Sequence, residues 1–139
     1  MNTTALKTLS LTLALSGASI AFAGHHEVAV KGVDQDVSHG YVSANMVKSD
    51  ANGWLVVHRT DSSMKPGPVV GYAPVIKGTN NNVNAILQEP VASGDMLMLM
   101  LHGEAGGMHT GVFEYTLGAT ADGPIRMNGE LVMSVITAK

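Results

Sequence analysis

The side chains of this chain that are best suited to chemistry are thioethers and imidazoles, and they concentrate between Asp95 and His109. This stretch reads DMLMLMLHGEAGGMH. Alternate side chains of a β-strand point to the same face, so three methionines and His102 share one face and three leucines share the other. Thioether and imidazole donors together suit copper, and thioethers favour Cu(I). A strand that is apolar on both faces is typical of a domain interior, between two packed layers.

The candidate metal ligands extend beyond this strand. They are His58, Met96, Met98, Met100, His102, Met108 and His109. His58 is expected from a neighbouring strand, whereas Met108-His109 follows in a glycine-rich loop, where packing does not explain the pair. Two alternatives stay open. For the strand methionines, the alternative to metal binding is that they fill gaps in a core. For His58 and His102, the alternative is a structural role in which each donates one ring nitrogen to a backbone carbonyl.

Residues 1–23 have the features of a signal peptide. Lys7 supplies a positive charge, Leu9 to Ile20 form an apolar run, and Ala21-Phe22-Ala23 fits the A-x-A cleavage pattern. The run is too short to span a bilayer comfortably, and no later stretch resembles a membrane anchor. We therefore predict cleavage after Ala23 and a periplasmic or secreted protein. A retained amphipathic or membrane-tethering helix is the alternative.

Cleavage after Ala23 would create a second candidate site, because the mature chain would begin Gly24-His25-His26. The free amine, two deprotonated backbone amides and the His26 imidazole then form a square plane of nitrogens. This is the geometry that Cu(II) and Ni(II) favour. A shift of the cleavage point by one residue would destroy it. The alternative is an irregular polar terminus without a role.

Composition indicates one domain that is held together by packing alone. The 116 residues after residue 23 are enough to bury roughly 65% of the unfolded surface, and the chain has no cysteine for a disulfide. We assign residues 24–36 to an N-terminal segment with an edge strand and residues 37–139 to the main domain. Removal of residues 1–23 takes away one of eight basic residues and none of the eleven acidic ones, which leaves a net charge of −4. Since the charges are dispersed, neither nucleic acid nor an anionic membrane is an expected partner.

The sequence lacks the signatures of the common enzyme classes. There is no cysteine nucleophile, no G-x-S-x-G elbow, no H-E-x-x-H helix and no phosphate-binding glycine loop. A blue-copper electron-transfer site is excluded, because it needs a cysteine thiolate. We therefore expect a non-enzymatic protein.

The elements that must position the candidate ligands are short strands separated by regular turn signals. Asn52-Gly53 predicts a hairpin between the segment 37–48 and a strand beginning WLVVH, and Asn128-Gly129 predicts a last hairpin. Another strand is expected at Val112 to Leu117. Seven to eight such strands with no helical period predict an all-β, antiparallel β-sandwich of Greek-key type. A partly closed barrel is the alternative.

Four phrases carry a resemblance to a known family. They are GWLVVHRTD, PGPVVGYAPVIKGTNNNV, LQEPVASGDMLMLMLH and DGPIRMNGELVMSVIT. Together, over Val37 to Thr137, they resemble a domain family of secreted proteins that is common in halophilic archaea, occurs in some bacteria and has no assigned function. The resemblance implies an exported, immunoglobulin-like sandwich and places His58 and His102 on the two histidine positions of the family pattern. The sequence departs from that pattern after His102, where relatives typically run acidic, so a site for a hard cation is not implied here.

Three functions follow as hypotheses. The first is an exported, non-enzymatic module that binds copper through Gly24-His25-His26 and the Met/His cluster. The second is a structural or protein-interaction module of the cell envelope without a metal site. The third treats the methionines as an oxidant sink, which requires exposed methionines that oxidise without unfolding the domain.

Overall fold

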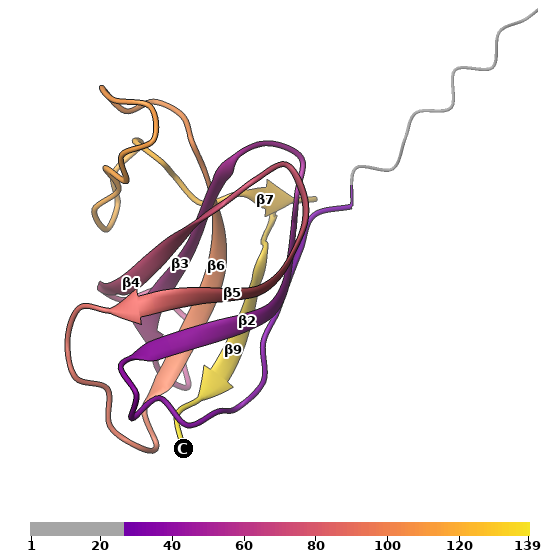
Figure 1. The fold of residues 1–139 in the computed structure, drawn as a ribbon. Helices are drawn as coiled ribbons and strands as arrows, with labels where there is room; N and C mark the ends of the chain where they lie inside the picture. The colour runs from indigo at the N-terminus through magenta and orange to yellow at the C-terminus, as the bar shows by residue number, and fades with distance from the viewer. Residues whose placement is uncertain (1–26) are drawn as a thin grey trace, which may run out of the picture.

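The computed structural model describes residues 27–139, and this part of the chain consists of β-strands, turns and irregular segments (Figure 1). The strands are β1 (Ala29–Lys31), β2 (Tyr41–Ser49), β3 (Gly53–Thr60), β4 (Val69–Val75), β5 (Gly78–Leu87), β6 (Met96–Gly103), β7 (Arg126–Met127), β8 (Glu130–Leu131) and β9 (Met133–Thr137). Seven of them form one sheet in the order β1-β2-β5-β4-β3-β6-β9, and β7 and β8 form a separate ribbon. Between residues 27 and 139 there is no helix capable of crossing a membrane.

The seven-stranded sheet folds over on itself to make two layers. β4 and β5 pair only at Gly71–Leu87 and Tyr72–Ile86; beyond this point β5 continues along β2, whereas β4 continues along β3. Figure 1 shows β2 and β5 lying across the layer that contains β3, β4, β6 and β9. All strand pairs are antiparallel. The prediction of an antiparallel all-β sandwich is therefore confirmed.

The two free edges of the sheet meet through a few contacts. The backbone N–H of Gly32, just after β1, donates to Ser134 Oγ of β9 at 3.3 Å. The N–H of Lys139 donates to the carbonyl of Gln35 at 2.8 Å. These contacts cover part of both edges, which limits edge-to-edge pairing with another chain.

The Met/Leu strand lies inside the sheet, as predicted, and divides its side chains between two buried regions. β6 pairs with β3 on one side and β9 on the other. Leu97, Leu99 and Leu101 belong to the core between the layers. Met98 and Met100 point to the opposite face and are equally buried. This second buried face requires a cover from outside the sandwich.

The predicted hairpin at Asn52-Gly53 is wrong. β2 pairs with β1 and β5, β3 pairs with β4 and β6, and residues 50–52 cross between the layers. Neither residue has a positive φ, which a type I′ turn requires. Glycine at position 53 serves another purpose, because a Cβ there would collide with the carbonyl oxygen of His102. By contrast, Asn128 and Gly129 have φ values of 53° and 87° and form the turn between β7 and β8.

The strand expected at Val112 to Leu117 is also absent. Residues 104–122, which we call the cap, form an irregular segment between β6 and β7. Gly106, Gly111 and Gly118 have positive φ values there, which interrupt the extended conformation. In Figure 1 this segment leaves the end of β6 and loops outside the sandwich before β7.

Gly53→Ala should lower the free energy of unfolding by about 2 kcal/mol, because the added methyl group forces β3 away from β6 and overpacks a close contact. Urea denaturation followed by tryptophan fluorescence measures the change. Gly123→Ala is the matched control, because its Cβ would lie 3.4 Å from the nearest atom, an ordinary contact distance. Equal stability of the two variants would contradict this account of the β3–β6 contact.

Candidate functional site

The candidate site lies on the outer face of β3 and β6. In the register of these strands Trp54 is opposite His102, Val56 is opposite Met100, and His58 is opposite Met98. All six side chains therefore share one face of the sheet. The Val56–Met100 pair lies midway between the two histidines, so the imidazoles can approach each other from opposite ends of the strand pair.

The two histidines meet through their Nε2 atoms, which are 3.2 Å apart. Their rings are nearly parallel, with an interplanar angle of 28° and centroids 5.3 Å apart. Nδ1 of His58 donates to the carbonyl of Gly67 at 2.8 Å, and Nδ1 of His102 donates to the carbonyl of Asp122 at 2.6 Å. Because a carbonyl only accepts, both Nδ1 atoms carry a proton. In the neutral pair both Nε2 lone pairs therefore face each other.

Burial keeps the two imidazoles in this neutral form. Both side chains are completely buried. Loss of solvation lowers the pKa of His102 to about 4; the carbonyl of Asp122 opposes this shift and the neighbouring His58 adds to it. Loss of solvation also lowers the pKa of His58, against the opposing effect of the Gly67 carbonyl. Neutral imidazole is the form that binds a metal ion.

Aromatic side chains of the cap cover the pair. The ring of Tyr115 meets His102 edge-on with centroids 4.5 Å apart, and it meets His58 at 5.9 Å. Phe113 extends the cover over β3 and β4, 5.5 Å from Trp54 and 4.3 Å from Tyr72. This cover excludes water from the outer face, which explains why both histidines are buried although they lie outside the sandwich core.

The cap is fastened by a buried carboxylate. Asp122 is fully buried, and its side chain accepts hydrogen bonds from the backbone N–H of Ala105 at 3.2 Å and of Glu114 at 2.8 Å. Its own N–H donates to the carbonyl of Ala105 at 2.8 Å. The same residue thus joins the start of the cap, its aromatic middle and the ring of His102.

The structure brings together some of the predicted ligands and separates others. His58 and His102 converge, and Met100 lies on the same face in the register position between them. Met108 is 86% exposed and His109 is also exposed, on the outside of the cap. Gly24, His25 and His26 lie outside the described residues. Within residues 27–139 no three side chains of His, Asp or Glu gather closely enough to hold a metal; the histidine pair itself offers two imidazoles.

The predicted alternative in which His58 and His102 each donate one ring nitrogen to a backbone carbonyl is confirmed, although the sequence did not identify which carbonyls accept. The carbonyls of Gly67 and Asp122 are backbone atoms, and no residue type marks them. The aromatic cover by Phe113 and Tyr115 was also missed, because this stretch was expected to be a strand. Asp122 was recognised in the sequence only as part of the turn at residues 121–124, and its burial was not predicted.

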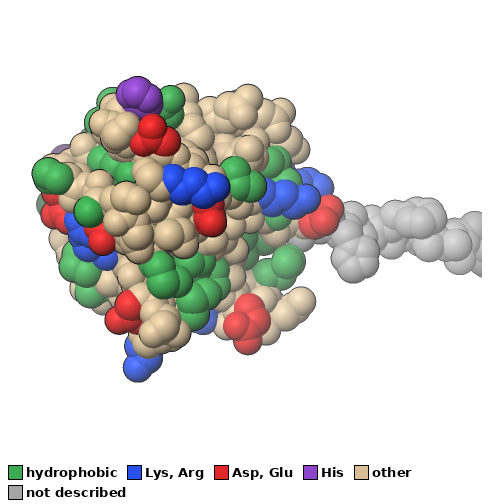
Figure 2. Space-filling model, turned by 90° about the horizontal axis from the view of Figure 1, so that it is seen from below, with side chains coloured by type: hydrophobic (Ala, Val, Ile, Leu, Met, Phe, Trp, Pro, Cys, Tyr) green, Lys and Arg blue, Asp and Glu red, His purple; other side chains and the backbone are tan. Residues whose placement is uncertain are grey.

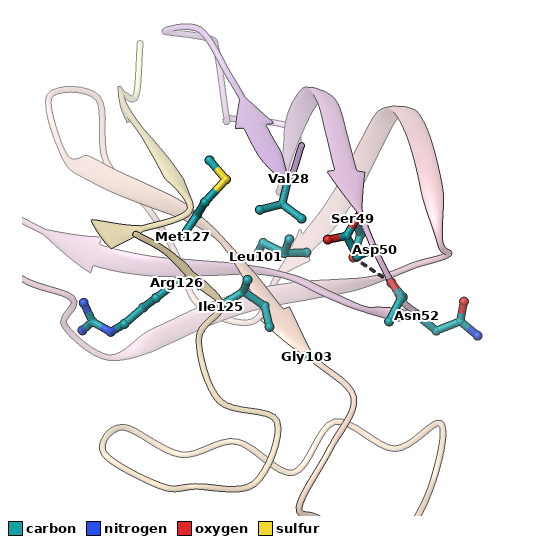
Figure 3. Close-up of a pocket in the computed structure, with 10 residues that line it drawn as sticks. Val28, Ser49, Asp50, Asn52, Leu101, Gly103, Ile125, Arg126 and Met127 are labelled. Carbon is teal, nitrogen blue, oxygen red and sulfur yellow. Dashed lines mark hydrogen bonds between the residues drawn. The ribbon is translucent and has the colours of Figure 1, made fainter. Parts of the chain in front are cut away.

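Other surface features lie apart from the histidine pair. A largely apolar cavity of about 240 Å³ opens at one end of the sandwich, lined by Leu101, Ile125 and Met127 among others (Figure 3). Leu101 points into the core between the layers, whereas His102 points to the outer face. On the face shown in Figure 2, charged side chains are dispersed among polar and hydrophobic ones.

Comparison with known proteins gives one family. Residues 28–139 match the model of a family described as a domain of unknown function, DUF7282. No curated protein matches the chain, and no solved structure matches it.

The stability of the domain should decrease between pH 7 and pH 4. Because the pKa of His102 falls from 6.5 to about 4 on folding, the unfolded chain takes up a proton first as the pH drops. The stabilisation is complete above pH 6.5 and is lost as the pH approaches 4. At about 1.4 kcal/mol per pKa unit, His102 accounts for about 3 kcal/mol of this loss.

Urea denaturation at a series of pH values measures this slope. His102→Asn keeps a side-chain N–H for the Asp122 carbonyl but cannot titrate, so it should flatten the pH dependence. His39→Asn, at an exposed histidine, is the control and should keep the wild-type slope. An unchanged slope in folded His102→Asn would contradict the assignment of the pH dependence to His102.

Proposed function

Since the chain belongs to the DUF7282 family, which has no known function, we propose for it the role of an exported, non-enzymatic β-sandwich module that binds Cu(I) between His58 and His102. The observation that carries the proposal is the 3.2 Å approach of two Nε2 atoms whose rings are both oriented by backbone carbonyls. Metal-binding histidines characteristically donate their second ring nitrogen to such an acceptor, which fixes the tautomer and raises the basicity of the ligating atom.

The separation of the nitrogens fits a metal with additional ligands. At metal–nitrogen distances of about 2.0 Å, two nitrogens 3.2 Å apart subtend an angle of about 106° at the ion. A linear two-coordinate ion would instead require a separation of about 4 Å. The angle therefore leaves space for at least one more donor beside the pair.

Met100 is the side chain best placed to be that donor. It lies on the same face as both histidines and at the register position between them, and it is 1% exposed. Met98, opposite His58, is the next nearest in the register. Thioether and imidazole together select Cu(I) among the common ions. A buried site beneath aromatic rings further favours an ion of low charge, because burial of charge is costly.

Metal binding would also remove an unfavourable feature of the empty pair. Two lone pairs that face each other at 3.2 Å repel, and each buried acceptor lacks a donor. A cation between them satisfies both at once. The structure of the pair thus contributes to affinity, since the ligands are held in place before the ion arrives.

Export is supported by the signal-peptide features of residues 1–23. The resemblance to secreted proteins of archaea and bacteria, with histidines at the positions of His58 and His102, supports a role shared by that family. The Gly24-His25-His26 terminus remains a separate prediction for Cu(II).

The alternative is a structural or interaction module of the envelope without a metal. One observation favours it: the two imidazoles fasten the loop at Gly67 and the cap at Asp122 to the sheet. On this alternative, loss of a histidine lowers stability and metal has no effect. An oxidant-sink role is less favoured for Met98 and Met100, because both are buried.

Anaerobic titration of the processed protein with Cu(I), in competition with a chromogenic chelator, tests the proposal. All proteins carry His26→Ala, so that the N-terminal site does not contribute. The parent should retain one Cu(I) per chain; His102→Asn should weaken binding at least 100-fold, and Met100→Leu about 10-fold, since each removes one ligand.

Met127→Leu is the matched control, at an exposed methionine on β7, and should bind as the parent does. Circular dichroism of each variant establishes that it is folded. If the parent retains no Cu(I) at micromolar concentration, or if neither substitution on β6 weakens binding, the proposal fails and the structural alternative takes its place.

A further inference from the structure

Asp122 is the only carboxylate that is completely buried among residues 27–139, and all of its polar groups have defined partners. One side-chain oxygen accepts from Ala105 N–H and the other from Glu114 N–H. Its backbone N–H donates to the Ala105 carbonyl, and its own carbonyl accepts from His102 Nδ1. A buried carboxylate is costly unless it is hydrogen-bonded in this way.

The backbone of Asp122 is held in a conformation that its side chain must support. Its φ is 45°, in the left-handed region that is unfavourable for most residues other than glycine, asparagine and aspartate. This conformation turns the carbonyl toward His102 at 2.6 Å. The two side-chain hydrogen bonds close a ring with the cap, so the direction of the carbonyl depends on the cap being in place.

The hydrogen bond from Glu114 connects the Asp122 side chain to the residues that cover the histidine pair. Its N–H, which binds the carboxylate, lies between Phe113 and Tyr115, the two residues that cover the histidine pair. Ala105, the other partner, is two residues after β6. A single side chain thus fastens the aromatic cover at one point and fixes the acceptor of the His102 ring at another.

We infer that Asp122 is the positioning residue of the histidine pair: it couples closure of the aromatic cap to the orientation of His102, so that Nε2 is presented to the metal only beneath a closed cap. This inference rests on the proposed function for its metal. The coupling itself is a property of the metal-free protein and is measured there.

Asp122→Asn is the informative substitution. Asparagine has the same shape and tolerates a positive φ, but one of its two terminal atoms becomes an NH₂ group. That group would face the N–H of Ala105 or of Glu114, donor against donor. The cap should loosen at this point, while the sandwich core should remain folded, because both hydrogen bonds of the Asp122 side chain go to residues of the cap.

The primary measurement is the ¹⁵N spectrum of the histidine side chains in the metal-free protein. The parent should show His102 protonated at Nδ1 and unprotonated at Nε2. In Asp122→Asn the two nitrogens should shift toward values for mixed tautomers, because the carbonyl no longer holds the ring. Cu(I) affinity should fall 10- to 100-fold, as it does when an outer-shell partner of a metal ligand is lost.

Asp95→Asn is the matched control. Asp95 immediately precedes β6 at its opposite end and likewise accepts from a backbone N–H, that of Ala92. It should leave both the His102 tautomer and the affinity unchanged. If Asp122→Asn does not fold, Asp122→Gly replaces it, since glycine keeps the backbone conformation and removes both hydrogen bonds.

The inference is overturned if the folded variant keeps the parent tautomer of His102 or the parent Cu(I) affinity. Failure of the proposed function gives a different result. In that case the parent binds no Cu(I), whereas the tautomer of His102 in the metal-free protein still responds to Asp122→Asn.

Discussion

The pairing of β3 with β6 is the constraint on which the rest of this structure depends. The two strands pair over eight residues without a register shift, from Gly53–Gly103 to Thr60–Met96. Their approach is so close at one end that only glycine fits at position 53. The register of the pair decides which side chains share a face. A slip of β3 by one residue would turn His58 toward the leucine core, while His102 on β6 would stay on the outer face.

The same pairing creates a second buried region outside the sandwich core. Leucines of β6 pack between the layers, and the methionines and His102 need another cover. The cap supplies it without forming regular structure: aromatic rings provide apolar area, and the Asp122 carboxylate satisfies backbone N–H groups that a strand ladder would otherwise pair. An irregular segment can be buried in this way only when its polar groups find such partners.

The histidine pair is an arrangement that a purely structural role does not require. One histidine would suffice to fasten each loop by its Nδ1, with its Nε2 pointing to solvent. Here both Nε2 atoms are turned toward each other and away from water. The two facing lone pairs would repel each other less if one Nε2 carried a proton and donated it to the other. Burial lowers the pKa of each ring, so this protonation is unfavourable near neutral pH. In the proposed function a soft cation would satisfy both nitrogens, and Met100, at the register position between the two histidines, would supply a third donor.

The sequence by itself determined the class of fold, the interior position of the Met/Leu strand and the sharing of one face by Met98, Met100 and His102, because a strand has a strict period of two. It also indicated that His58 and His102 could belong to one site. Only the tertiary structure decided that residues 50–52 cross between layers, that the stretch after β6 is a cap, and that Met108 lies exposed. The reason is physical. Alternation is a local property of the chain, whereas strand partners, and the backbone carbonyls that orient the rings, are set by contacts between segments far apart in sequence.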